Sequence, residues 1–214
     1  MKALKFFKTS IKFLFICTLV LLASCKKKPA AEEEMPTCSC PHCVIYIQPY
    51  ENFTKEEVYA ILPDLQKNFD KWLYGGWEFK VLDPKPLPAE SYVKNRERYK
   101  AKVILDSLNK FPLTGIDKNI LFMGLTHKDI CANVHGMDNY GIIGYSYSPG
   151  QASVVSDKRI KTKSMVWKPM LHEFIHAFYG AKHCPKDDKK CFMVDFKGKG
   201  NIEMQEWLCD ACKH

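Results

Sequence analysis

The chain has 214 residues, of which 46% are hydrophobic and 13% aromatic, so it is long enough to bury a hydrophobic core of its own. Its formal net charge at pH 7 is +8, and half of this charge comes from four lysines near the N-terminus, Lys2, Lys5, Lys8 and Lys12. The positive charge that remains is too small to indicate nucleic-acid binding, so we expect no nucleic-acid partner.

The N-terminus predicts a processing signal rather than part of the fold. A lysine-bearing start precedes the apolar run 13–23, which is short for a membrane span and has the length of a secretory signal core. The run ends in Leu22-Ala23-Ser24-Cys25, which resembles a bacterial lipobox with a lipidated cysteine. An ordinary signal peptide or an uncleaved anchor is the alternative. We therefore expect a lipoprotein signal peptide at 1–24 and an extracytoplasmic protein held at a membrane of a bacterial cell envelope by lipid on Cys25.

Residues 25–43 predict a tether followed by a cysteine-rich segment. The part from 26 to 37, KKKPAAEEEMPT, is charged and poor in apolar groups, which is typical of a solvated linker. Disulfide bonds are the default state of cysteines in an oxidising compartment. We expect such pairing among Cys38, Cys40, Cys43 and Cys131. His42 in the CSCPHC run keeps a further metal site open as an alternative.

Residues 44–214 predict one domain of the mixed α/β (α+β) class, with one twisted mixed sheet and packed helices. A capping box of Thr54 and Glu57 opens a helix that ends near Phe69, and a long basic helix is predicted around 93–109. Gly141 and Gly144 predict the close approach of another backbone. Strands are predicted at 44–47, 77–82, 120–124, 140–147 and 152–156, and the turn 148–150 can join the last two as a hairpin.

The run from His172 to Cys184, HEFIHAFYGAKHC, is the strongest functional signal. Residues four apart on a helix share a face, so His172 and His176 can bind one metal ion while Glu173 lies beside it. Zinc held by imidazoles acidifies its bound water, and a nearby carboxylate can take the proton as the water attacks a carbonyl. This is the chemistry of peptide hydrolysis. A solvated helix with two surface histidines is the alternative, but the apolar side chains around the motif favour a metal site.

The residues around this motif predict how the site is completed. Pro169 is expected in the first turn of the helix, and Gly180 is expected to end it. The turn after Gly180 lets His183 fold back as a third ligand, which leaves a fourth position for water. A second group of residues comes next, and its spacing fits either a four-thiolate zinc site or two disulfide bonds: Cys184, Cys191, Cys209 and Cys212.

These motifs together resemble the signature of the archaemetzincins, a branch of the metzincin zinc peptidases. Besides HEFIHAFYGAKHC, the resemblance includes Cys191-Phe192-Met193 and Cys209-Asp210-Ala211-Cys212, and it extends over roughly residues 44–212. It implies a metzincin-like domain in which Glu173 is the general base, Met193 forms the Met-turn, and the strand 140–147 is a sheet edge for a peptide. It also implies two zinc ions, a catalytic one held by His172, His176 and His183, and a structural one held in a C-terminal knot by Cys184, Cys191, Cys209 and Cys212.

The sequence departs from the family pattern between His176 and Gly180, where it has three residues and the family has two. An added helical residue rotates the residues after it by about 100° and advances them by about 1.5 Å. Either a bulge or a rebuilt turn must then bring His183 to the metal. Two functions are open: a membrane-tethered, monomeric zinc endopeptidase or aminopeptidase acting on peptides or proteins, and a zinc-stabilised binding lipoprotein with little or no hydrolytic activity.

Overall fold

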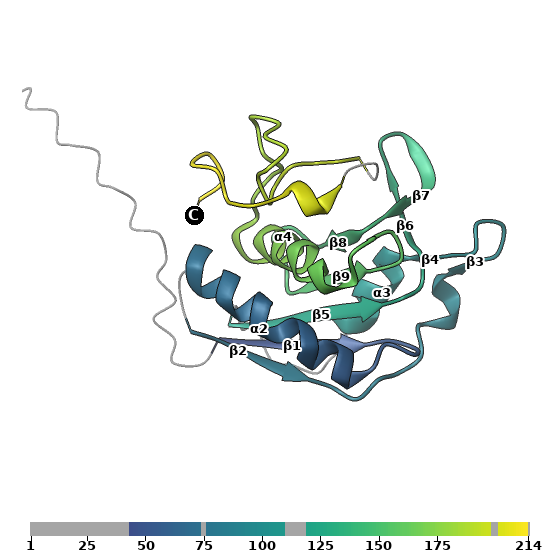
Figure 1. The fold of residues 1–214 in the computed structure, drawn as a ribbon. Coiled ribbons are helices and arrows are strands. Elements are labelled where there is room, and N and C mark those ends of the chain that lie inside the picture. Colours follow the sequence, from purple (N-terminus) through teal and green to yellow (C-terminus); the bar gives the residue numbers. More distant parts are fainter. Residues whose placement is uncertain (1–42, 74–75, 110–118, 198–200, 214) are drawn as a thin grey trace, which may run out of the picture. The chain divides into compact units, whose positions relative to one another are not determined.

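Two mixed β-sheets with helices packed against them make up the fold of this computed structural model (Figure 1). The structure describes residues 43–73, 76–109, 119–197 and 201–213, all within one compact unit, Pro36–His214. Strands lie in the order β2-β1-β5-β9-β8 in one sheet and β3-β4-β6-β7 in the other. The mixed α/β class is confirmed. The prediction of one twisted sheet is wrong, because the predicted strand 140–147 is divided between the two sheets.

The five-stranded sheet carries the site. Four of its strands are parallel, and they are β1 (Cys43–Pro49), β2 (Trp77–Val81), β5 (Ile120–Thr126) and β9 (Ala152–Ser156). The central ones are buried on both faces, which explains why they read as continuous apolar runs. β8 (Gly144–Ser146) pairs antiparallel with β9. It forms the edge of the sheet, with no further strand paired to it in the part of the chain that the structure describes.

The four-stranded sheet contains β3 (Tyr92–Val93), β4 (Arg98–Lys100), β6 (Ile130–Val134) and β7 (Met137–Ile142). The helix predicted over 93–109 is therefore wrong in its first half, and only α3 (Ala101–Leu108) is helical. Arg98 explains the difference, because its Nε donates to Asp129 Oδ2 at 2.8 Å and its Nη1 donates to the Asn139 carbonyl at 2.9 Å. These contacts to distant residues favour a strand over the local helical pattern. The sequence did not predict β6.

Helices cover both faces of the five-stranded sheet. α2 (Lys55–Trp72) and α4 (Trp167–Tyr179) bury one apolar core, in which Phe69 and Phe174 are in contact, whereas α3 packs on the opposite face (Figure 1). The predicted capping box at the start of α2 is confirmed, since Thr54 and Glu57 bond each other's backbone N–H. α4 thus lies with its apolar side against the sheet and the other helix.

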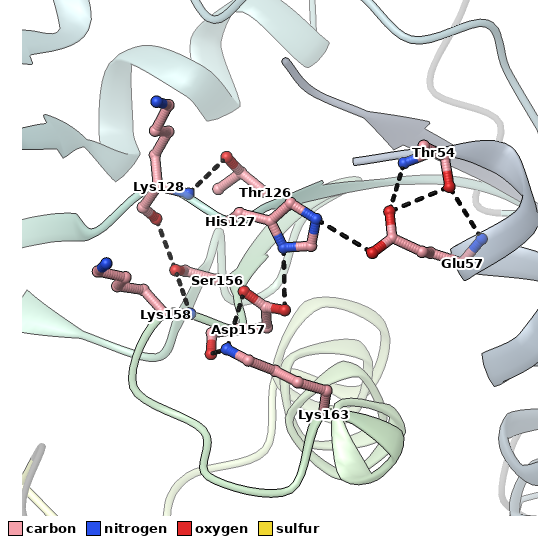
Figure 2. A network of polar contacts seen from close by, with 9 residues as sticks. All are labelled: Thr54, Glu57, Thr126, His127, Lys128, Ser156, Asp157, Lys158 and Lys163. Atoms are coloured by element: carbon pink, nitrogen blue, oxygen red, sulfur yellow. Dashed lines mark hydrogen bonds and ion pairs between the residues drawn. The ribbon is translucent and has the colours of Figure 1, made fainter. Parts of the chain in front are cut away.

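A polar network fixes the start of α2 to the carboxyl ends of β5 and β9 (Figure 2). His127 lies between two carboxylates, 3.3 Å from Glu57 Oε1 through Nε2 and 3.0 Å from Asp157 Oδ2 through Nδ1. Lys163 Nζ donates to the Asp157 carbonyl at 2.5 Å. Because Asp157 comes directly after β9 and Lys163 precedes α4, the network also restrains the loop that leads into α4.

The cysteines outside the predicted zinc knot differ in state. Cys43 is disulfide-bonded, as predicted. Cys131 has a free thiol, so its predicted pairing is wrong: it is fully buried on β6, and its Sγ lies 3.9 Å from Asn139 Oδ1. Cys25, Cys38, Cys40 and His42, with the leader and tether, lie outside the described residues. Of the helices that the structure describes, none has both the length and the apolar character to cross a membrane.

Candidate metal centre

The metal helix absorbs the extra residue by extending. α4 is continuous from Trp167 to Tyr179, with Pro169 in its first turn as predicted. Gly180 ends it in the left-handed conformation at φ 65°, and its N–H donates to the His176 carbonyl at 3.1 Å. Gly150 N–H donates to the Ala177 carbonyl at 2.8 Å. The turn after the helix is therefore rebuilt, and no bulge is needed.

The rebuilt turn brings the three predicted histidines together. The ligand atoms of His172, His176 and His183 all lie within 4.8 Å of one another, and 3.0 Å separates the Nε2 atoms of the first two. Zn–N bonds of about 2.0 to 2.1 Å in a tetrahedral site place ligand nitrogens about 3.3 Å apart. The three nitrogens therefore fit a zinc ion.

In two of these rings, the nitrogen that is not left for the metal, Nδ1, is hydrogen-bonded. His172 donates Nδ1–H to the Phe192 carbonyl, and His176 donates Nδ1–H to the Ala181 carbonyl, both at 2.6 Å. These bonds leave the Nε2 lone pairs for a metal, as in known zinc sites. Burial lowers the pKa of His172 to about 3 and also lowers the pKa of His176. Both rings are therefore neutral, which is the form that binds metal.

Glu173 lies in the same cleft and packs against the edge strand. Its side chain is 6% exposed, and burial raises its pKa to about 8, while a hydrogen bond with Ser146 acts in the opposite direction. A Cβ added to Gly144 would lie 2.5 Å from Glu173 Oε1. The predicted close approach of another backbone at Gly144 is wrong, because the side chain of Glu173 occupies the space. The same holds for Gly141, where the Arg159 guanidinium fills it.

The histidines and Glu173 line a cleft of about 630 Å³. One wall is formed by α4 and β8, including Tyr145 and Ser146. The other comes from the turn between β6 and β7, where His135 lies, and from the segment 194–197 with Asp195. Ser146, His135 and Asp195 were not among the predicted site residues. The His135-Gly136 pair, which is compatible with a tight turn, and an aspartate two residues after Met193 were the available signals.

The four predicted thiols also converge. The Sγ atoms of Cys184, Cys191, Cys209 and Cys212 lie within 4.8 Å of one another, and all four thiols are free. Between Cys184 and Cys209 the Sγ atoms are 3.6 Å apart. A disulfide bond would need about 2.05 Å, whereas Zn–S bonds of about 2.3 Å place tetrahedral sulfurs about 3.8 Å apart. The cluster therefore fits a four-thiolate zinc site.

The pKa shifts favour a metal-binding thiolate at Cys184 but not at Cys191. Burial raises the pKa of Cys184, but backbone N–H groups of Asp188 and Lys186 bond its sulfur, so that its pKa is lowered overall. Such N–H donors stabilise a thiolate. Burial dominates at Cys191 and raises its pKa to about 11. A metal ion is what would deprotonate the buried thiols together.

A short turn joins the two clusters. Phe192 accepts the hydrogen bond from His172, and the Met193 carbonyl accepts one from Cys184 N–H at 2.7 Å. Met193 is fully buried, as expected of a residue packed under the site. Lys168 at the start of α4 holds the C-terminal segment, because its buried Nζ donates to the carbonyls of Ile202, Glu203 and Gln205.

Comparison with known proteins agrees with this geometry. No protein-family model matches the chain. An archaemetzincin from Haloarcula marismortui is 28% identical over 152 residues, which cover 64% of this chain and 81% of that protein. The crystal structure of an archaemetzincin from Archaeoglobus fulgidus has a TM-score of 0.59 at 26% identity, and the match covers 79% of this chain and 97% of that one. The chain is similar in sequence and in fold to archaemetzincins.

The archaemetzincin fold has further neighbours. The crystal structure of a zinc-dependent peptidase from Methanocorpusculum labreanum has a TM-score of 0.60 at 16% identity, and the match covers 78% of this chain and 97% of that chain. At this identity the likeness shows a shared fold. Within that fold, this chain brings together all seven predicted metal ligands.

Proposed function

We propose that this protein is a zinc-dependent peptidase of the archaemetzincin type, with Glu173 as the general base. The observation that carries the proposal is the position of Glu173 in the cleft that His172, His176 and His183 also line. Its side chain is buried against Gly144 and bonded to Ser146. A site that only binds metal needs no buried carboxylate beside the ligands. A hydrolytic site needs one.

The proposed mechanism assigns the proton transfers to Glu173. When bound, zinc supplies Lewis-acid chemistry, acidifying a water and polarising the scissile carbonyl. The Glu173 carboxylate accepts the proton of the attacking water and passes it to the leaving amine. Its burial supports this role, because desolvation makes the carboxylate a stronger proton acceptor. Gly144 and Ser146 orient the carboxylate.

The edge strand β8 gives the proposed substrate a place to bind. Its outer side has no strand partner among the described residues, and its Gly144, Tyr145 and Ser146 line the cleft. A peptide can add to such an edge as a further strand, which gives main-chain hydrogen bonds without requiring a particular sequence. The cleft then offers about 630 Å³ for side chains. Peptides or unfolded segments of proteins fit this geometry best.

Substitution of Glu173 tests the proposal. Purified protein should cleave peptide or unfolded-protein substrates, and Glu173→Ala and Glu173→Gln should lose at least about 100-fold in kcat/KM. Zinc content should stay at the wild-type value, because Glu173 ligates nothing. Glu56→Ala, at an exposed position of α2, is the matched control. Unchanged hydrolysis in both Glu173 variants would contradict the assignment of the base. Absence of hydrolysis in the wild type would favour the binding lipoprotein.

We further propose two zinc ions per chain, one at the three histidines and one at the four cysteines. Support comes from the two donor clusters and their spacing. Native mass spectrometry of the mature protein should give two zinc ions. Disulfide bonds among Cys184, Cys191, Cys209 and Cys212 would contradict the second site.

The envelope location is also a proposal, and it rests on the sequence around Cys25 alone. We propose that a lipid on Cys25 holds the peptidase domain at a membrane. Incorporation of labelled fatty acid into the wild type, and its loss in Cys25→Ala, would support this. Label retained in Cys25→Ala would exclude it.

A further inference from the structure

His183 differs from the other two clustered histidines in the group that faces its Nδ1 atom. The Nδ1 atoms of His172 and His176 each donate to a backbone carbonyl. His183 faces a carboxylate instead, with 3.9 Å between its Nδ1 and Asp195 Oδ2. A carboxylate is a charged acceptor and orients a ring more strongly than a carbonyl does.

His183 also needs more support than the other two rings. It comes after the helix instead of belonging to it, and 48% of its side chain is exposed. Its ring lies against those of His172 and His176, with centroids 5.4 Å and 4.8 Å away. The family's third histidine comes one residue earlier, so the rebuilt turn alone must set the direction of His183. A polar partner is the remaining means of orienting it.

Asp195 is itself held in place. The backbone N–H of Lys197 donates to Asp195 Oδ1 at 2.7 Å, which is a local turn typical of aspartate. The other oxygen, Oδ2, lies 4.0 Å from Nε2 of His135 and 3.9 Å from Nδ1 of His183. One carboxylate oxygen thus lies between two imidazole rings. Both distances exceed a hydrogen bond by about 1 Å, so the carboxylate faces both rings without bonding either of them in this structure.

His135 reaches this position from the second sheet. It forms with Gly136 the two-residue turn between β6 and β7, and the two residues have φ of 55° and 71°. Asn-Gly is the pair best suited to such a turn, and histidine tolerates it at some cost. Tyr140 on β7 lies edge-on to the His135 ring at 5.7 Å and donates its hydroxyl to the Lys197 carbonyl at 2.5 Å. The hairpin therefore meets the segment 195–197 at two points.

We infer that Asp195 is a positioning residue of the metal site: it accepts a hydrogen bond from His183 Nδ1 when the site is filled, and His135 holds the same carboxylate from the other side. The inference rests on the proposed histidine zinc site and does not depend on hydrolysis. A carboxylate behind a ligating histidine fixes the ring and increases the basicity of its metal-binding nitrogen. The second sheet thereby contributes to metal affinity.

The test measures zinc affinity in Asp195→Asn. Asparagine keeps the size of the side chain and an oxygen for Lys197 N–H, but it removes the charge. We expect zinc at the histidine site to bind about 10 to 100 times more weakly, measured with zinc itself by competition against a chelator of known affinity. The ion at the cysteines should be retained. Asp83→Asn is the matched control, because Asp83 is 92% exposed and its carboxylate pairs with Lys55 at the surface.

His135→Asn separates the two halves of the inference. Asparagine suits the turn, so the hairpin should keep its stability, and zinc affinity should fall by a smaller factor of about 3 to 10. The double variant should bind zinc no more weakly than Asp195→Asn alone, since His135 acts through Asp195. Zinc affinity of Asp195→Asn within twofold of the wild type would overturn the inference, and so would loss of both zinc ions. A wild type without peptidase activity would defeat the proposed function and leave this result standing.

Discussion

Replacing Gly144 by alanine should displace Glu173, the proposed general base, while leaving the fold intact. The added Cβ would lie 2.5 Å from Glu173 Oε1, 2.6 Å from Cγ and 2.8 Å from Cδ. Non-bonded carbon atoms prefer about 3.5 Å or more, so the carboxylate must move by about 1 Å. The atoms that must move belong to the Glu173 side chain and not to a backbone, and for this reason β8 itself can stay in place.

A displacement of about 1 Å at a reacting group costs about 100-fold in rate, which corresponds to about 2.7 kcal/mol of transition-state stabilisation. We therefore expect kcat/KM of Gly144→Ala on a peptide substrate to fall about 100-fold, mostly through kcat. Zinc content and the unfolding midpoint in urea should stay near the wild-type values. Gly76→Ala is the control, because no atom lies within 4 Å of its added Cβ.

Unchanged activity in Gly144→Ala would refute this reasoning. If Gly144→Ala hydrolyses the peptide as fast as the wild type, then Glu173 is not held in its active position by β8. Loss of zinc or of folding in Gly144→Ala would show that the glycine serves the structure rather than the base. Ser146→Ala should give a smaller loss in kcat, because it removes one hydrogen bond to Glu173 without displacing the carboxylate.

Three further substitutions test how the site is supported. Lys168→Met removes the donor to three carbonyls of the C-terminal segment, of which only that of Ile202 keeps another partner among the described residues, the Gln205 N–H, so the free energy of unfolding should fall by about 2 to 4 kcal/mol in urea denaturation, whereas the exposed Lys189→Met should change it little. Gly141→Ala pushes the Arg159 guanidinium off its carboxylate partner and should cost about 1 to 2 kcal/mol; this cost should vanish in an Arg159→Ala background. Cys212→Ser should remove one zinc ion per chain and lower Tm, and two ions retained in that variant would count against the cysteine site.

Patterns within short stretches of the sequence predicted the elements that interactions between neighbouring residues form. The capping box at Thr54, the buried parallel strands and the glycine that ends α4 all depend on residues close in sequence. The predicted helix over 93–109 failed where a distant residue decided the outcome, because Arg98 extends to meet Asp129. The single predicted strand over 140–147 failed for a related reason. Its two halves pair with different strands, β6 and β9.

The sequence by itself determined which residues could bind metal, since these histidines and cysteines are identifiable from type and spacing. Tertiary structure decided whether they meet. His183 reaches the other two histidines because the helix continues through Tyr179 and turns at Gly180, a geometry that depends on Gly150 from another loop. Tertiary structure alone also brought Gly144 to Glu173 and Asp195 to His183. Such contacts join residues far apart or in irregular segments, and no periodicity of the chain encodes them.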